Sequence, residues 1–221
     1  MKKIVYAIVA FVMIAMSGTA HADVLNLGGN YSQIASLVNP GSGVVARSEG
    51  GGSIETSYLD GRKLDYLYCV DLFTTISPGS YSSTTVNNQA EIHGVAVKNA
   101  DKVAYLLEKH GTGGQGDQAI ALQAAIWHEI YGAGVYDLNY TGSTATTINL
   151  YEQYLTEAVN KYGDVSKFIW INPDYATGAM KQGLVTSSPN PEPSTYALLG
   201  IGGLFAAFRF RKSRIASAVS A

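Results

Sequence analysis

Two apolar runs stand near the ends of the chain, and the pattern between them differs from both. The first run, residues 4–16, follows Lys2 and Lys3 and precedes a small-residue site that ends at Ala22. A basic start, a short apolar segment and such a site are typical of a secretory signal peptide. We therefore expect residues 1–22 to be removed on export, so that the mature protein begins at Asp23.

The second apolar run, residues 194–208, follows a proline-rich linker at 188–193 and precedes a cluster of arginine and lysine. A membrane-spanning helix needs about 20 residues. The run approaches this length if Arg209 extends its charged end towards the membrane surface. Because basic residues favour the cytoplasmic side, we expect a transmembrane helix at 194–210 and a basic cytoplasmic tail at 211–221.

Residues 23–187 have the length and mixed pattern of one globular domain. Apolar and polar residues alternate in several short segments, which predicts strands at 44–47, 53–59, 63–73, 81–86, 92–97, 168–172 and 182–185. Asp60-Gly61 is a strong hairpin signal between two of them. Helical periodicity predicts one helix between Asn99 and Gly111, a second at 117–131 and a third at 147–162, with Asn99 and Asp117 as the caps of the first two. Strands on both sides of a helical insert indicate an α+β fold.

Gln123 interrupts the apolar face of the second predicted helix. At about 100° per residue, Ile120, Ala124 and Trp127 lie on the same side as Gln123. A glutamine that faces a core is costly unless its amide finds hydrogen-bond partners. Its environment therefore needs an explanation.

Cys69 is the only cysteine of the chain and lies within the predicted strand 63–73. Alternation there places Tyr68 and Val70 on one face and Leu67, Cys69 and Asp71 on the other. Cysteines of exported proteins usually pair as disulfides, so a single one requires a reason. It is a buried apolar thiol, a partner in an intermolecular bond, or a reactive or internally bonded group.

Charge and motif content exclude several classes of function. The formal net charge is −2 and the basic residues of the domain are scattered, whereas nucleic-acid binding needs a concentrated basic face. The sequence has no dinucleotide-binding glycine motif, no phosphate loop and no His/Cys/Asp grouping with metal-ligand spacing. We expect no nucleic-acid partner, no metal and no cofactor.

Pro191-Glu192-Pro193, the apolar run behind it and the basic cluster resemble a PEP-CTERM sorting signal. The resemblance implies recognition by an exosortase in a Gram-negative bacterium. It also implies transient anchoring in the inner membrane, removal of the helix, and delivery to the cell surface or the extracellular matrix.

The segments Tyr68-Cys69-Val70-Asp71 and Leu122-Gln123-Ala124-Ala125-Ile126-Trp127 resemble those of the thioester domains of bacterial surface adhesins. This resemblance implies an internal thioester between Cys69 and Gln123 on a barrel-like or sandwich core of strands. It further implies covalent attachment to an amine on a surface or matrix partner. Tyr68 and Trp127 neighbour the two bonding residues and are expected to shield the thioester from water. The family usually has threonine where Leu122 stands.

The chemistry of such a bond is intelligible from the two residue types. The Cys69 thiolate attacks the Gln123 carbonyl and expels ammonia, while N–H groups near the start of the helix are expected to stabilise the oxyanion. The product is a single-turnover binding domain rather than an enzyme, so no catalytic residue is expected.

Two other functions remain open on sequence alone. One is a non-covalent matrix or adhesion domain in which the Gln123 amide only makes hydrogen bonds and forms no thioester. The other is a cysteine hydrolase or acyltransferase with His93, His110 or His128 as its base; solvent exposure is the expected state of these histidines.

Overall fold

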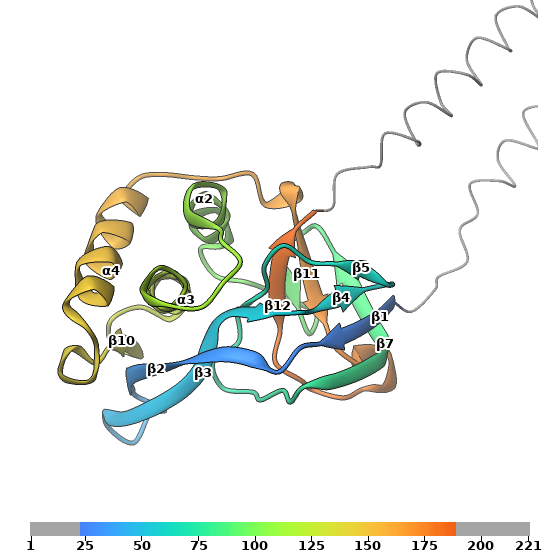
Figure 1. The fold of residues 1–221 in the computed structure, drawn as a ribbon, viewed down its shortest axis with the longest axis horizontal. Coiled ribbons are helices and arrows are strands. Elements are labelled where there is room, and N and C mark those ends of the chain that lie inside the picture. The colour runs from blue at the N-terminus through green and yellow to red at the C-terminus, as the bar shows by residue number, and fades with distance from the viewer. Residues whose placement is uncertain (1–22, 189–221) are drawn as a thin grey trace, which may run out of the picture. The chain divides into compact units, whose positions relative to one another are not determined.

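The computed structural model describes residues 23–188, which form a sheet-rich α+β fold (Figure 1). The main sheet has seven strands in the order β5-β4-β1-β7-β11-β12-β6 and curls like half a barrel. Its strands are β1 (Asp23–Leu27), β4 (Tyr58–Leu59), β5 (Arg62–Lys63), β6 (Tyr68–Cys69), β7 (Gly79–Asn87), β11 (Phe168–Asn172) and β12 (Leu184–Ser187). All of its pairings are antiparallel. The α+β prediction is confirmed.

Two smaller sheets accompany the main one. A three-stranded sheet has the order β10-β2-β3, with β2 (Asn30–Val38), β3 (Val45–Glu55) and β10 (Tyr136–Leu138). A two-stranded hairpin joins β8 (Glu91–Ile92) to β9 (Val95–Ala96). The sequence pattern did not predict β1, β2 or β10.

Three α-helices lie between β9 and β11 in the sequence, which confirms the helical insert. They are α2 (Ala100–His110), α3 (Asp117–Tyr131) and α4 (Ala145–Ala158), accompanied by 3-10 turns at Tyr140–Gly142 and Val165–Lys167; a further 3-10 turn, Tyr175–Thr177, follows β11. Helix α3 packs against β3 on one side and against α2 and α4 on the other (Figure 1). For this reason its buried residues surround most of the helix rather than forming one stripe: Ala119, Ala121, Leu122, Gln123, Ala124, Ala125, Ile126, Trp127 and Ile130.

The bounds of α3 match the prediction, but the caps of the first two helices were wrong. Asn99 adopts a left-handed conformation, and its side chain donates to the Glu129 carbonyl instead of capping α2. Gly116 is the residue before α3, and Asp117 accepts hydrogen bonds from the hydroxyls of Thr144 and Thr147.

Helix α4 also differs from its predicted bounds. Thr144 caps it, accepting from the backbone N–H of Thr147, so the helix begins before the predicted residue. It ends at Ala158, before the predicted residue 162, and Tyr162 lies exposed outside the helix.

The Asp60-Gly61 hairpin is confirmed: both residues have positive φ, and Tyr58 pairs with Lys63 across the turn. The single strand predicted at 63–73 is wrong, because only β5 and β6 form there. Leu67, Tyr68, Cys69 and Val70 are all buried, so the expected alternation of faces fails.

The strand predicted at 92–97 is also wrong. It is the β8–β9 hairpin, which turns at His93 and Gly94, both with positive φ. In the described part of the chain, no helix is long and apolar enough to cross a membrane. The transmembrane helix predicted at 194–210 and the signal peptide lie outside the described residues.

Candidate functional site

The structure brings Cys69 and Gln123 together. The Gln123 amide oxygen accepts from the Cys69 backbone N–H at 2.8 Å, and its amide nitrogen donates to the Cys69 carbonyl oxygen at 2.7 Å. Gln123 is 0% exposed and Cys69 1%. Both hydrogen-bond partners of the buried Gln123 amide are therefore backbone groups of Cys69, the only cysteine of the chain.

Sheet topology explains why these backbone groups are available. Strand β6 is the last strand of the main sheet and pairs only with β12, with Cys69 opposite Leu184. The next residue, Val70, donates to the Gly183 carbonyl. Because hydrogen-bonding directions alternate along a strand, the N–H and C=O of Cys69 face away from β12. Gln123 occupies this open edge from α3.

Gly51 lets strand β3 pass directly over the pair. A Cβ at this position would lie 2.9 Å from Gln123 Cγ and 3.1 Å from the Trp127 ring. Gln123 and Trp127 therefore share one contact surface, and Trp127 is fully buried with its ring edge on Tyr136. This places Trp127 beside the pair, where a shielding group was predicted.

Tyr68 is also fully buried, but its contacts lie elsewhere. Its hydroxyl donates to the Thr112 carbonyl at 2.8 Å, and its ring lies 5.7 Å from that of Tyr66. These contacts attach β6 to the loop after α2. Its predicted shielding role rests only on its place next to Cys69.

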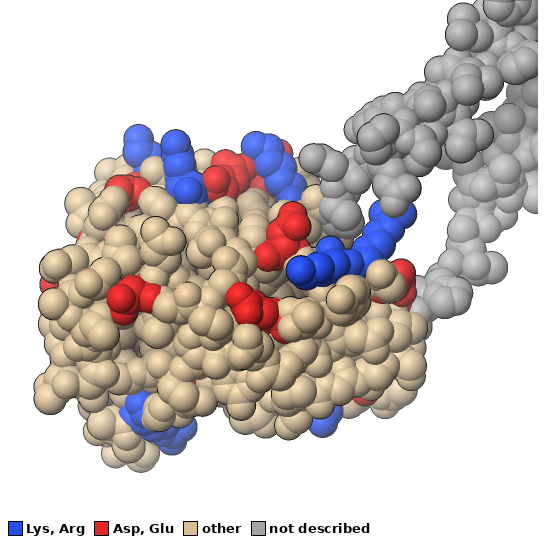
Figure 2. Space-filling model, in the orientation of Figure 1, with Lys and Arg blue, Asp and Glu red and all other residues tan. Residues whose placement is uncertain are grey.

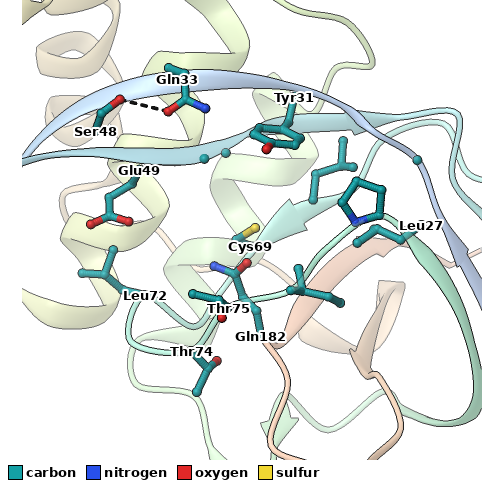
Figure 3. A pocket seen from close by; sticks show the side chains of 16 residues that line it. Leu27, Tyr31, Gln33, Ser48, Glu49, Cys69, Leu72, Thr74, Thr75 and Gln182 are labelled. Atoms are coloured by element: carbon teal, nitrogen blue, oxygen red, sulfur yellow. Dashed lines mark hydrogen bonds between the residues drawn. The ribbon is translucent and has the colours of Figure 1, made fainter.

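The Cys69 sulfur faces a pocket of about 260 Å³ between β2, β3 and the segment after β6 (Figure 3). Strands β2 and β3 contribute Tyr31, Gln33, Ser48 and Glu49 to its wall. The other side includes Leu72, Thr75 and Gln182. The pocket therefore reaches the residue that carries the sulfur, although Cys69 itself is only 1% exposed.

Burial and, to a smaller extent, the nearby Asp71 carboxylate raise the pKa of the Cys69 thiol to about 12. The Asp71 carboxylate accepts hydrogen bonds from Phe73 N, Thr74 and Tyr131. It therefore supports the chain that follows β6. At neutral pH the thiol is protonated, which makes it a weak nucleophile.

The N–H groups at the start of α3, predicted to stabilise an oxyanion, are not the groups that contact the Gln123 amide oxygen. Gln123 is in the second turn of α3, beyond the unpaired N–H groups of the helix start. The donor to its amide oxygen is instead the N–H of Cys69, the same residue that carries the sulfur.

The three candidate base histidines have other partners among the described residues. His93 Nδ1 lies 3.9 Å from Asp71, His110 Nε2 lies 2.8 Å from Glu157, and His128 Nδ1 lies 2.7 Å from the Tyr151 hydroxyl. The expectation of solvent-exposed rings was wrong for His93, whose side chain is 7% exposed. No group of His, Cys, Asp and Glu within residues 23–188 has an arrangement that could hold a metal ion.

A scan against protein families adds a finding outside the described residues. Residues 191–212 match the PEP-CTERM protein-sorting motif. The PEP-CTERM motif includes Pro191, Glu192 and Pro193 and indicates an exported protein that an exosortase sorts to the cell surface. This confirms the sorting prediction. Neither the search of curated proteins nor the search of solved structures finds a match.

Sequence reasoning missed two residues of this site, Glu49 and Gln182. Glu49 lies on the part of β3 that the pattern left between two predicted strands. Gln182 precedes β12, and its side-chain nitrogen donates to the Asp71 carbonyl at 2.7 Å. Nothing in the linear pattern connects either residue to Cys69, because the pocket exists only once β3 crosses the end of β6.

Proposed function

We propose that this exported protein attaches covalently to an amine-bearing surface or matrix molecule through a thioester between Cys69 and Gln123. The observation that carries the proposal is the pair of hydrogen bonds between the Gln123 amide and the Cys69 backbone. These bonds hold the carbonyl carbon of Gln123 against the residue that supplies the nucleophile. Such fixed proximity can offset about 7–11 kcal/mol of an activation barrier.

The two hydrogen bonds also suit the individual steps. The sulfur attacks the Gln123 carbonyl carbon and the C–S bond forms; the C–N bond then breaks, and the departing nitrogen takes the thiol proton and leaves as ammonia. The Cys69 N–H lies 2.8 Å from the oxygen that gains negative charge, within the range of an oxyanion-hole donor. The departing nitrogen is already held by the Cys69 carbonyl.

Burial suits the storage of a thioester until a partner arrives. Both residues are almost completely covered, and Trp127 packs beside Gln123, so little of a thioester between them is exposed to water. The pocket beside the sulfur admits a small nucleophile. An amine then forms an amide with Gln123 and frees Cys69, which happens once per molecule; in this proposal the protein is therefore not an enzyme.

A second candidate function is non-covalent binding in the extracellular matrix. The same hydrogen bonds favour it, because they satisfy both ends of the buried amide, as a purely structural glutamine requires. In that case Gln123 only closes the open edge of β6, and Cys69 remains a buried thiol.

Methylamine incorporation distinguishes the two candidates. With a thioester, methylamine adds to Gln123 and leaves Cys69 as a free thiol, which peptide mapping by mass spectrometry detects. The Cys69→Ala variant is the matched control and is expected to incorporate none. Unmodified Gln123 in the treated native protein contradicts the covalent proposal.

Anchoring and release are proposed steps on the route to the surface. The segment 194–210 holds the protein in the inner membrane until the exosortase removes it. Replacing Pro191, Glu192 and Pro193 with alanine is expected to leave the full-length protein in the membrane fraction. Unchanged delivery of that variant to the surface contradicts this route.

A further inference from the structure

Glu49 is the one charged side chain among the residues that line the pocket at Cys69. Figure 3 shows Glu49 and Leu72 towards one end of this pocket, Leu27 at the other, and Cys69 between them. The remaining walls combine aliphatic side chains with uncharged polar ones such as Gln182. A carboxylate at one end of a largely neutral pocket attracts a cation.

The Glu49 carboxylate is available for such a contact. It makes no hydrogen bond to another described side chain, and its one ion-pair contact among the described residues is with Arg47 at 4.0 Å, a long separation for an ion pair. The Arg47 side chain is 45% exposed and that of Glu49 25%. The pair is therefore loose, and a cation in the pocket can replace Arg47 at little cost.

The reacting amine itself cannot be that cation. Nucleophilic attack needs the neutral amine with its lone pair free, and Figure 3 draws the Glu49 carboxylate apart from the Cys69 sulfur. A ligand that meets both groups at once therefore has two nitrogen groups, one neutral at the thioester and one cationic at Glu49. An aliphatic spacer between them matches the aliphatic part of the wall, including Leu72.

We propose that this pocket selects amines that carry a second, positively charged group, as diamines and polyamines do, and that Glu49 is the specificity-determining residue. The inference rests on the proposed thioester. The neutral amine attacks the Gln123 carbonyl carbon, the C–N bond forms and the C–S bond breaks. The amine proton passes to the departing sulfur, which leaves as the neutral Cys69 thiol.

The experiment compares nucleophiles on protein whose thioester has first been verified by the loss of one ammonia from its mass. Diaminobutane, diaminopentane and butylamine are reacted at one pH and low salt, and adduct formation is followed by mass spectrometry. We expect both diamines to react about threefold to tenfold faster than butylamine, with an advantage that falls as salt is added. Equal rates for butylamine and the diamines overturn the inference.

Two variants assign the effect to Glu49. Glu49→Gln keeps the shape of the side chain and is expected to abolish the diamine advantage, while the rate with hydroxylamine, a small uncharged nucleophile, stays unchanged. Arg47→Gln removes the competing cation and is expected to increase the advantage. A diamine advantage that survives in Glu49→Gln overturns the assignment. Absence of the ammonia loss in the starting protein instead refutes the proposed thioester, so the two failures are distinguishable.

Discussion

Replacing Cys69 with alanine tests whether a covalent bond links the two residues in the folded protein. They are 54 positions apart, so a thioester closes a loop of that length. Closing such a loop restricts the unfolded chain and contributes about 4 kcal/mol to the free energy of unfolding. The alanine side chain leaves both Gln123 hydrogen bonds in place, because these bonds use the backbone of residue 69.

Without a thioester, the same replacement removes only one buried sulfur. That loss costs about 1 kcal/mol. With the thioester, we expect the variant to lose about 4–5 kcal/mol in total, and the melting temperature to fall by about 8–20 °C for a domain of this size.

Urea denaturation followed by circular dichroism measures the difference. Protein treated with methylamine is the second comparison, since it keeps the Cys69 side chain and lacks the cross-link, with one methyl group added to the Gln123 amide. It is expected to lose nearly the same stability as the alanine variant. If the untreated, treated and variant proteins unfold within about 1 kcal/mol of one another, the covalent bond is absent.

Three further predictions follow from the same contacts. Gly51→Ala places a methyl group 2.9 Å from Gln123 Cγ. We therefore expect the free energy of unfolding, measured by urea denaturation, to fall by about 1–3 kcal/mol, and ammonia release to be slower. An unchanged free energy of unfolding contradicts this packing. Because burial holds the pKa of the Cys69 thiol at about 12, the reactive thiolate becomes more abundant as the pH rises. Ammonia release on refolding is therefore expected to accelerate about tenfold per pH unit from neutral pH to about 9. A rate that does not change with pH contradicts attack by the thiolate. Asn99→Gly keeps the left-handed conformation but removes the hydrogen bond to the Glu129 carbonyl, and is expected to lower the free energy of unfolding by about 1 kcal/mol. Asn99→Ala is expected to lower it further, because alanine is strained in that conformation. An equal loss for both variants contradicts this account.

The sequence predicted those elements whose signals are local. Helix α3 has a strong apolar content and is followed by Gly132, and its bounds agree with the prediction. The Asp60-Gly61 turn was recognisable because both positions need positive φ, which this dipeptide tolerates. Gln123 was identifiable because a carboxamide among apolar neighbours on a helix has to meet a partner.

Features that depend on tertiary context could not be predicted in this way. The segment around Cys69 is buried throughout, with β3 and Gln123 of α3 packed against it, so alternation carries no information about its faces. Strand β2 turns Ile34, Ser36 and Val38 inward, and the serine in that row hides its periodicity. The pocket joins β3, the segment after β6 and Gln182, two residues before β12, which are distant in sequence.

The intact mass of the untreated protein, isolated after export, tests the central claim most directly. The covalent account predicts a mass lower by one ammonia than the mass calculated from the processed sequence, with no thiol detectable after denaturation at acidic pH. The full calculated mass, together with one titratable thiol at Cys69, contradicts it.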